Sequence, residues 1–148
     1  MILKKLLSYT ETADAVVIKT FMQAKQSMPQ AEALFSHVLN AQHIWISRIN
    51  QMDNRFNRFD IHPVSMFNTL HQEISGQLNQ ILDTSELDKI ISYSTFSGDK
   101  FDSTLEDILL HVVNHSTYHR AQIATYFKQN NVKPPETDFI TYQRAGFL

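Results

Sequence analysis

The segment 103–130 most constrains the fold, because it has the length and pattern of one long α-helix. Ser103 and Glu106 have the spacing of a capping box, which predicts Ser103 as the N-cap. The pattern ends near Asn130. Apolar residues recur at helical spacing on one sector, which comprises Leu105, Leu109, Val112, Ile123 and Phe127. Such a helix is stable when this sector packs against other elements, so the chain is expected to be built from packed helices.

The apolar spacing elsewhere predicts three further helices, over about 3–25, 29–50 and 66–82. Ser27 and Pro29 suit the start of the second of these helices. The stretch 52–65 is polar and contains Pro63, so it is expected to be a loop. With only 3 Gly and 4 Pro, the composition is unlike that of a β-rich fold.

Two smaller elements are expected beside the helices. β-branched and aromatic residues around a Ser-Gly-Asp turn in 90–101 predict a small hairpin or loop insertion before the fourth helix. After Pro134-Pro135, the pair Thr137-Asp138 suits the cap of a short C-terminal helix that reaches about Arg144. The predicted fold class is all-α, a four-helix bundle in a single domain over 1–148.

Composition excludes several kinds of function. The chain has no Cys, so disulfides, thiolate metal sites and a cysteine nucleophile are excluded. The formal net charge is −2 and no basic run is interleaved with aromatic residues, so no nucleic-acid partner is expected. No segment approaches the roughly 18 apolar residues that a membrane span needs, so no membrane partner is expected either. The N-terminal apolar run is too short for a signal peptide, and a soluble, cytoplasmic protein is expected.

The histidines suggest a metal site. His115 and His119 are one helical turn apart, which places them on one helix face with Cβ atoms roughly 5–6 Å apart. Both border the apolar sector, so they are expected to face inward or into a cleft. His111 lies one turn earlier and is expected to be solvated, with a place at the mouth of a cleft or beside the ligands as alternatives. An HxxxH pair alone is a weak signal, and a partly buried polar stripe is its ordinary interpretation.

A helical wheel of the second helix adds a third histidine. The wheel places Leu34, Val38, Ala41 and Trp45 on one buried face. His37 lies at the margin of that face, whereas His43 points to the opposite side. A core-edge histidine bonded to a backbone carbonyl is as consistent with this position as a metal ligand. His62 and His71 have no partner nearby in sequence and are expected at the surface.

Two imidazoles from one helix and one from another would hold an ion while leaving coordination positions open, as in catalytic sites. Zn²⁺ is the simplest choice, and Ni²⁺ or Fe²⁺ also suits imidazole ligands. Such an ion lowers the pKa of bound water and deprotonates a bound thiol. Asn114, Tyr118, Arg120 and Gln122 are candidates for contacts to the ligands, but solvated positions are their default interpretation.

Four stretches resemble a known family. Residues 114–123 read NHSTYHRAQI and resemble the NHxxxHRGQ signature of the DinB-like (DinB/YfiT) proteins. His37 with Trp45 resembles that family's second-helix motif, 9–14 resembles its first-helix YNxWAN motif, and the tail 134–140 is also similar. Ala121 replaces the usual Gly, which is mild in a helix, and Thr12 and Asp14 replace Trp and Asn.

The resemblance implies a bundle of up-down-down-up order, often dimeric, and a divalent metal held by three histidines. Carried over by position, these are His37, His115 and His119. Relatives in the wider superfamily include transferases and isomerases that use low-molecular-weight thiols such as bacillithiol or mycothiol. The resemblance therefore implies a homodimer with a small-molecule substrate and a divalent cofactor, Zn or Ni.

The sequence leaves three hypotheses about function open. The first is that the chain is a metal-dependent enzyme, either a thiol-dependent S-transferase or a hydrolase. Alternatively it is a non-catalytic metal-binding protein of a stress response, in which the metal links the second and fourth helices. The third hypothesis is a structural helical dimer without metal. No carboxylate accompanies the histidines in sequence, so no general base is identified.

Overall fold

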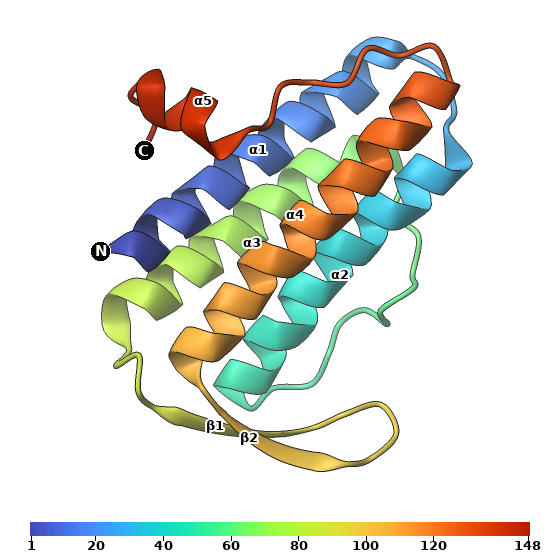
Figure 1. The fold of residues 1–148 in the computed structure, drawn as a ribbon. Helices are drawn as coiled ribbons and strands as arrows, with labels where there is room; N and C mark the ends of the chain where they lie inside the picture. Colours follow the sequence, from blue (N-terminus) through green and yellow to red (C-terminus); the bar gives the residue numbers. More distant parts are fainter.

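Four long helices form the body of the protein. The computed structural model describes all residues 1–148. It contains α1 (Ile2–Ala24), α2 (Pro29–Asn50), α3 (Val64–Thr84), α4 (Leu105–Gln129) and a short α5 (Phe139–Arg144). In Figure 1, α1 and α4 run in one direction and α2 and α3 in the other. The predicted all-α class is confirmed, and the helix directions agree with the up-down-down-up order.

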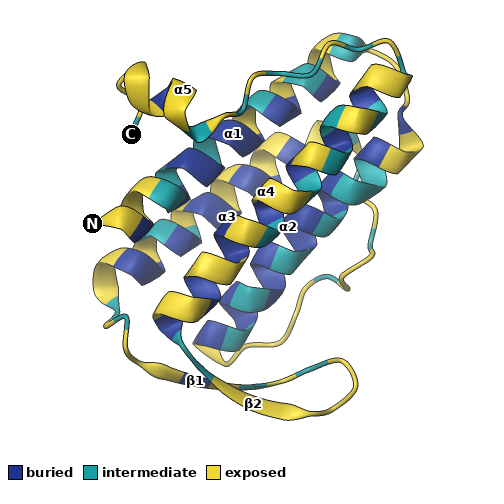
Figure 2. Ribbon diagram, in the orientation of Figure 1, coloured by how far each residue is buried: buried dark blue, intermediate teal, exposed yellow.

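The core lies where the four helices meet. α1 and α2 each pack on both α3 and α4, so α1 lies diagonally across the bundle from α2. Four buried phenylalanines, one from each helix, make edge and tilted ring contacts toward the end of the bundle where α2 and α3 begin: Phe21–Phe127 and Phe35–Phe67 have centroids 4.9 Å apart. The buried residues, dark blue in Figure 2, follow the inward faces of the helices. This packing holds α2 and α4 in a fixed relation, which positions the histidines.

The connection between α2 and α3 is long because these helices run in the same direction. A helix of 22 residues is roughly 33 Å long, so the chain must travel that distance back before α3 begins. Residues 51–63 make this return, and a chain of that length extends to about 43 Å. Figure 1 shows this loop alongside α2. The predicted loop therefore exists, and it covers the side of α2 that carries His37.

The expected hairpin is present between α3 and α4. Strand β1 (Ile90–Ser94) pairs antiparallel with β2 (Lys100–Thr104). The predicted capping box at Ser103 is wrong, because Ser103 pairs with Ile91 and its hydroxyl lies 3.2 Å from the Tyr93 hydroxyl. Thr104 is the N-cap of α4, and its side-chain oxygen accepts the Asp107 N–H at 3.1 Å. The second strand thus continues directly into the helix.

The start of α2 also differs from the sequence expectation. Pro29 occupies the first turn as predicted, but Met28 rather than Ser27 is at the N-cap position. Met28 has no side-chain oxygen to cap the helix. Its own N–H instead donates to the Glu32 carboxylate at 2.7 Å, and its side chain is fully buried. The start of this helix is therefore fixed by packing of Met28 and by Glu32.

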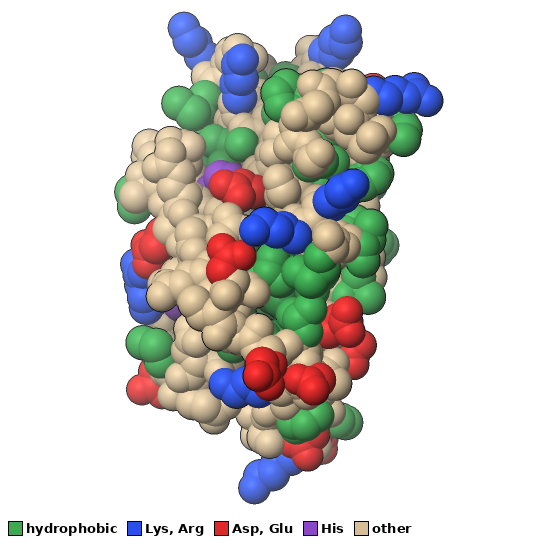
Figure 3. All heavy atoms as spheres, turned by 90° about the vertical axis from the view of Figure 1, so that its left-hand side faces the viewer, with side chains coloured by type: hydrophobic (Ala, Val, Ile, Leu, Met, Phe, Trp, Pro, Cys, Tyr) green, Lys and Arg blue, Asp and Glu red, His purple; other side chains and the backbone are tan.

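The C-terminal tail packs on α1. The Tyr9 hydroxyl donates to the Thr137 carbonyl at 2.6 Å, and the Tyr9 ring contacts the rings of Phe139 and Tyr142. Both chain ends therefore lie on the same side of the bundle in Figure 1. The surface seen from that side carries interspersed acidic and basic side chains around a group of hydrophobic ones (Figure 3). None of the helices combines the length and hydropathy that crossing a membrane requires.

Candidate metal centre

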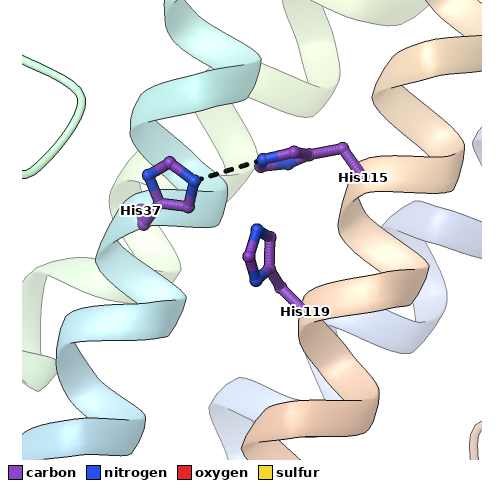
Figure 4. Close-up of side chains that lie close together, drawn as sticks. All are labelled: His37, His115 and His119. Atoms are coloured by element: carbon purple, nitrogen blue, oxygen red, sulfur yellow. Dashed lines mark hydrogen bonds between the residues drawn. The ribbon is translucent and has the colours of Figure 1, made fainter.

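Three histidines from two helices meet at one point. His37 comes from the middle of α2, and His115 and His119 come from successive turns of α4. Each histidine offers one ring nitrogen, and these three nitrogens all lie within 4.8 Å of one another. Figure 4 shows the three imidazoles turned toward a common space between the helices. All three side chains are half-buried, so this space can be reached from solvent.

Hydrogen bonds donated by Nδ1 orient two of the rings. His37 Nδ1 lies 2.9 Å from the Arg58 carbonyl oxygen, and His119 Nδ1 lies 2.7 Å from the Gln122 side-chain oxygen. Both partners are assigned as acceptors, so each Nδ1 carries the proton and donates it. The Nε2 atoms of His37 and His119 therefore keep free lone pairs, which is how metal-binding histidines are usually held.

The spacing of the nitrogens fits a small divalent ion. His37 Nε2 and His115 Nε2 are 3.2 Å apart. Zn–N bonds of about 2.0–2.1 Å at tetrahedral angles place two ligand nitrogens roughly 3.3 Å apart. Ring centroids separate by 5.0 Å for His37 and His115, 4.9 Å for His37 and His119, and 4.5 Å for His115 and His119. This donor set can hold a metal ion with little rearrangement.

The surroundings keep the imidazoles of α4 neutral. Burial, followed by the neighbouring His119, His37 and His111, lowers the pKa of His115 from 6.5 to about 3. Burial also lowers the pKa of His119, against the Gln122 hydrogen bond, which raises it. A neutral imidazole is the form that binds a metal ion. At neutral pH no proton has to leave His115 before an ion binds.

A buried polar network lies behind the histidines. Gln42 on α2 donates to Asp14 on α1 and to Ser116 on α4, both at 3.0 Å. Asp14 also accepts a 2.6 Å hydrogen bond from Arg120, and this ion pair is almost wholly buried. The network ties three helices together next to His115 and His119 along α4. It fixes the helix faces on which the three histidines lie.

A cavity of about 660 Å³ adjoins the histidines. His37 and His115 form part of its wall, and α2, α4, the turn of the hairpin and the 51–63 loop supply the rest. The volume is within the usual range for small-molecule sites. An ion held by the three histidines would therefore face a space large enough for a substrate.

The remaining histidines were placed less well by the sequence. His111 is solvated as expected, although it also lines this cavity and packs edge-on against Trp45, 5.3 Å between centroids.

His71 was expected at the surface but is 4% exposed, because its side of α3 faces the bundle. His62 was also expected at the surface, yet it is half-buried and bonded to Asn40 at 2.6 Å. His43 was expected on the side of α2 opposite its buried face, yet it is 7% exposed, because the 51–63 loop covers that side and the Arg55 N–H donates to its Nε2 at 2.9 Å.

The helical wheel of α2 found the correct margin for His37 but misplaced the centre of the buried face. Val38 is fully buried, whereas Leu34, Ala41 and Trp45 are only half-buried. Ala41 and Trp45 line the cavity instead. The face that packs against both α3 and α4 is centred on residues that include Phe35 and Leu39.

Sequence reasoning also missed functional neighbours of the histidines. Arg120 and Gln122 were given solvated positions by default, but Arg120 is buried and Gln122 bonds His119. Asn114 and Tyr118 are exposed, in agreement with that default. The Arg58 carbonyl could not have been found, because a backbone acceptor in a loop leaves no signal in the side-chain pattern. Gln122 lies three residues after His119, and that helical spacing was a usable signal.

Comparison with known proteins adds evidence of descent. A search of curated proteins found no match to the chain. The model of the DinB family matches residues 19–146, which include α2 to α5 and all three converging histidines. The match extends over far more than half of the sequence, and the chain therefore belongs to the DinB family.

Proposed function

We propose that this protein binds one divalent metal ion, Zn²⁺ or Ni²⁺, through His37, His115 and His119, and acts as a metal-dependent enzyme on a small molecule. The observation that carries the proposal is the meeting of three imidazoles with the Nδ1 atoms of His37 and His119 already bonded to oxygen acceptors. Without an ion, the three imidazoles make a single hydrogen bond to one another, between the Nε2 atoms of His37 and His115 at 3.2 Å, whereas a divalent ion would engage all three. The third hypothesis, a helical dimer without metal, is disfavoured on this ground.

Each residue has a defined part in such a site. His37, His115 and His119 would be the ligands, while the Arg58 carbonyl and the Gln122 amide would hold two of the rings in their binding orientation. A bound divalent ion supplies Lewis acidity and the ability to deprotonate a coordinated thiol or water. With three ligands from the protein, a coordination position stays open toward the cavity, as in catalytic rather than structural sites.

The lining of the cavity favours transfer of a thiol over hydrolysis. Hydrolysis generally uses a base beside the ion, most often a carboxylate, and no Asp or Glu lines the cavity, where His111 is the remaining candidate base. A thiol is itself a strong nucleophile once deprotonated, so it needs less help from a protein base. We therefore propose a thiol-dependent S-transferase with an external low-molecular-weight thiol, and keep hydrolysis as the alternative. The homodimer expected from the family resemblance stays a prediction.

The metal content of the purified protein tests the proposal. The protein is prepared without a histidine tag or chelator and is analysed by mass spectrometry beside a His37→Ala/His115→Ala variant. We expect about one equivalent of Zn or Ni in the native protein and a loss in the variant to a small fraction of that. His111→Ala is the matched control, because it removes a histidine of the same cavity and should leave the metal in place.

Two results would contradict the metal site. One is a native protein that contains no metal and takes up none on titration with Zn²⁺ or Ni²⁺. The other is equal metal content in the native protein and the double variant. If the metal is present, conjugation of several thiols to a model electrophile separates an enzyme from a non-catalytic metal-binding protein. Activity that depends on both thiol and metal would support the transferase.

A further inference from the structure

The cavity beside the histidines carries two positively charged side chains without acidic partners. Arg48, from the last turn of α2, and Arg58, from the 51–63 loop, both line it. The ion pairs of the structure are Lys4–Asp83, Arg55–Glu73 and Arg120–Asp14, so neither guanidinium contacts a carboxylate. Two arginines that meet in one cavity without a counter-charge are a common arrangement for binding an oxyanion.

Aromatic rings hold these arginines in place. The guanidinium carbon of Arg48 lies 4.5 Å from the Trp45 ring centroid, and Arg48 donates to the Ser94 carbonyl at 3.1 Å. Both guanidinium groups also approach Phe96 at the turn of the hairpin, with Arg48 at 5.5 Å and Arg58 at 4.6 Å from its centroid. Cation–π contacts at such distances orient a guanidinium but leave N–H donors free. The two charges therefore lie around one ring, at the mouth of the cavity.

Arg58 links this charged region to the three histidines. Its backbone carbonyl accepts the His37 Nδ1–H, while its side chain reaches Phe96. The same cavity thus has imidazoles in one part of its wall and two arginines with flat apolar rings in another. A molecule that occupied the whole space would have one end at the histidines and an anionic end at the arginines.

We propose that this cavity binds a small molecule that carries a carboxylate or phosphate group beside a flat apolar portion, with Arg48 and Arg58 holding the oxyanion and Trp45 and Phe96 contacting the apolar portion. The proposal deepens the proposed function, because it gives the chemical class of the substrate that would reach the three histidines. The oxyanion contacts themselves require no metal. They can therefore be tested apart from the metal site.

The single tryptophan of the chain makes the cavity directly observable. Trp45 lines it, so a ligand that enters should change the tryptophan fluorescence. The probes are phenyl phosphate, phenylacetate and the neutral benzyl alcohol, each titrated into the full chain in the presence of a metal chelator. We expect at least one of the two anions to bind at least about tenfold more tightly than benzyl alcohol, and the better anion identifies phosphate or carboxylate as the preferred group.

An arginine variant separates specific binding from general attraction of anions. Arg48→Gln/Arg58→Gln should weaken binding of the better anion at least about tenfold while leaving benzyl alcohol unchanged. Arg55→Gln/Lys100→Gln removes the same charge from residues outside the cavity lining and should leave the affinity within about twofold. Metal content is measured on the same samples. It should match the native protein, since Arg58 contacts His37 only through its backbone.

Three outcomes would overturn the proposal. They are equal affinity for benzyl alcohol and both anions, equal affinity of the native protein and the Arg48→Gln/Arg58→Gln variant, and no change in Trp45 fluorescence with any probe. Loss of the metal site alone would look different. In that case anion binding would persist in a protein that takes up no Zn²⁺ or Ni²⁺, which would refute the metalloenzyme and leave the oxyanion site standing.

Discussion

At the scale of single residues, the buried ion pair between Asp14 and Arg120 has a direct consequence for stability. Both side chains are almost wholly buried, and the Nε of Arg120 has no hydrogen-bond partner. Burial opposes the positive charge of Arg120, but the Asp14 carboxylate more than offsets this and raises the pKa of the guanidinium above its usual value. The buried cation therefore depends on one carboxylate from another helix.

Replacing Asp14 by Asn tests this dependence. The amide keeps the size and one acceptor oxygen of Asp14 but leaves the Arg120 charge uncompensated inside the bundle. We expect the free energy of unfolding to fall by about 3 kcal/mol, measured by urea denaturation of the metal-free protein. Asp83→Asn is the matched control, because its ion pair with Lys4 is exposed and its loss should change stability little. If the two variants lose the same free energy of unfolding, the buried ion pair contributes no more to stability than the exposed one.

The converging histidines were predictable because each has a signal within its own helix. His115 and His119 are one turn apart, and His37 lies at the edge of an apolar face. Their partners were harder to predict. Asp14 and Arg120 are 106 positions apart in sequence, and no local pattern reports that they meet. The same holds for His71, whose burial depends on how α3 is turned toward its neighbours.

At the scale of elements, the junction between β2 and α4 determines where the histidine-bearing helix begins. Thr104 ends the strand and caps the helix, and its hydroxyl contacts both the N–H and the carboxylate of Asp107. Ser103, one residue earlier, belongs to the ladder with Ile91. The sequence analysis placed the cap at Ser103 because Glu106 follows it at capping-box spacing, although Thr104 stands at the same spacing from Asp107. Only the pairing of the strands decides between them.

The two neighbouring hydroxyls give a direct comparison. Thr104→Ala removes the side-chain acceptor of the Asp107 N–H and should destabilise the protein by about 1 kcal/mol. Ser103→Ala removes only a half-exposed hydroxyl contact with Tyr93 and should cost clearly less. Urea denaturation of both variants measures the difference. A larger loss for Ser103→Ala than for Thr104→Ala would restore the capping box that the sequence suggested.

Helix positions were predicted within about two residues, because long amphipathic segments carry a strong periodic signal. The errors lie at the ends and around the helix axis. Ends depend on caps such as Met28, which packing rather than a side-chain oxygen fixes. The helical wheel of α2 assumed a single buried face. In the structure this helix packs on both α3 and α4, and some of its side chains line the cavity.

At the scale of the whole molecule, the two long connections shape the cavity. The 51–63 loop contributes Arg58 and the hairpin contributes Phe96, while α2 and α4 contribute the histidines. The bundle alone would leave His37 and His115 on an open groove. The family resemblance implied the directions of α2 and α3, but no sequence signal indicated that Phe96 of the hairpin turn would meet Arg58 of the loop, because both lie in segments without a periodic pattern. The fold class was therefore predictable, and the cavity was not.

The same loop adds to the pH dependence of the stability, beside the half-buried histidines of α4. It packs over His43 and includes His62, which bond the Arg55 N–H and the Asn40 side chain respectively. Burial, followed by Arg55, lowers the pKa of His43 below 6.5, and burial lowers that of His62 despite Asp60. Below about pH 6.5, His43 and His62 therefore bind protons more readily in the unfolded chain than in the folded protein. The two histidines contribute fully to stability above that pH. This contribution is lost as the pH falls toward their lowered pKa values in the folded protein.

We accordingly expect the free energy of unfolding of the chelator-treated protein to decrease between about pH 7.5 and pH 5.5, measured by urea denaturation. His43→Gln should decrease less steeply over the same range, since its side-chain oxygen can still accept the Arg55 N–H but does not titrate. Parallel curves for the native protein and the variant would show that His43 does not sense pH. If the two proteins differ only in the acidic part of the range, the pH dependence arises at the contact between His43 of α2 and the 51–63 loop. The same loop orients His37.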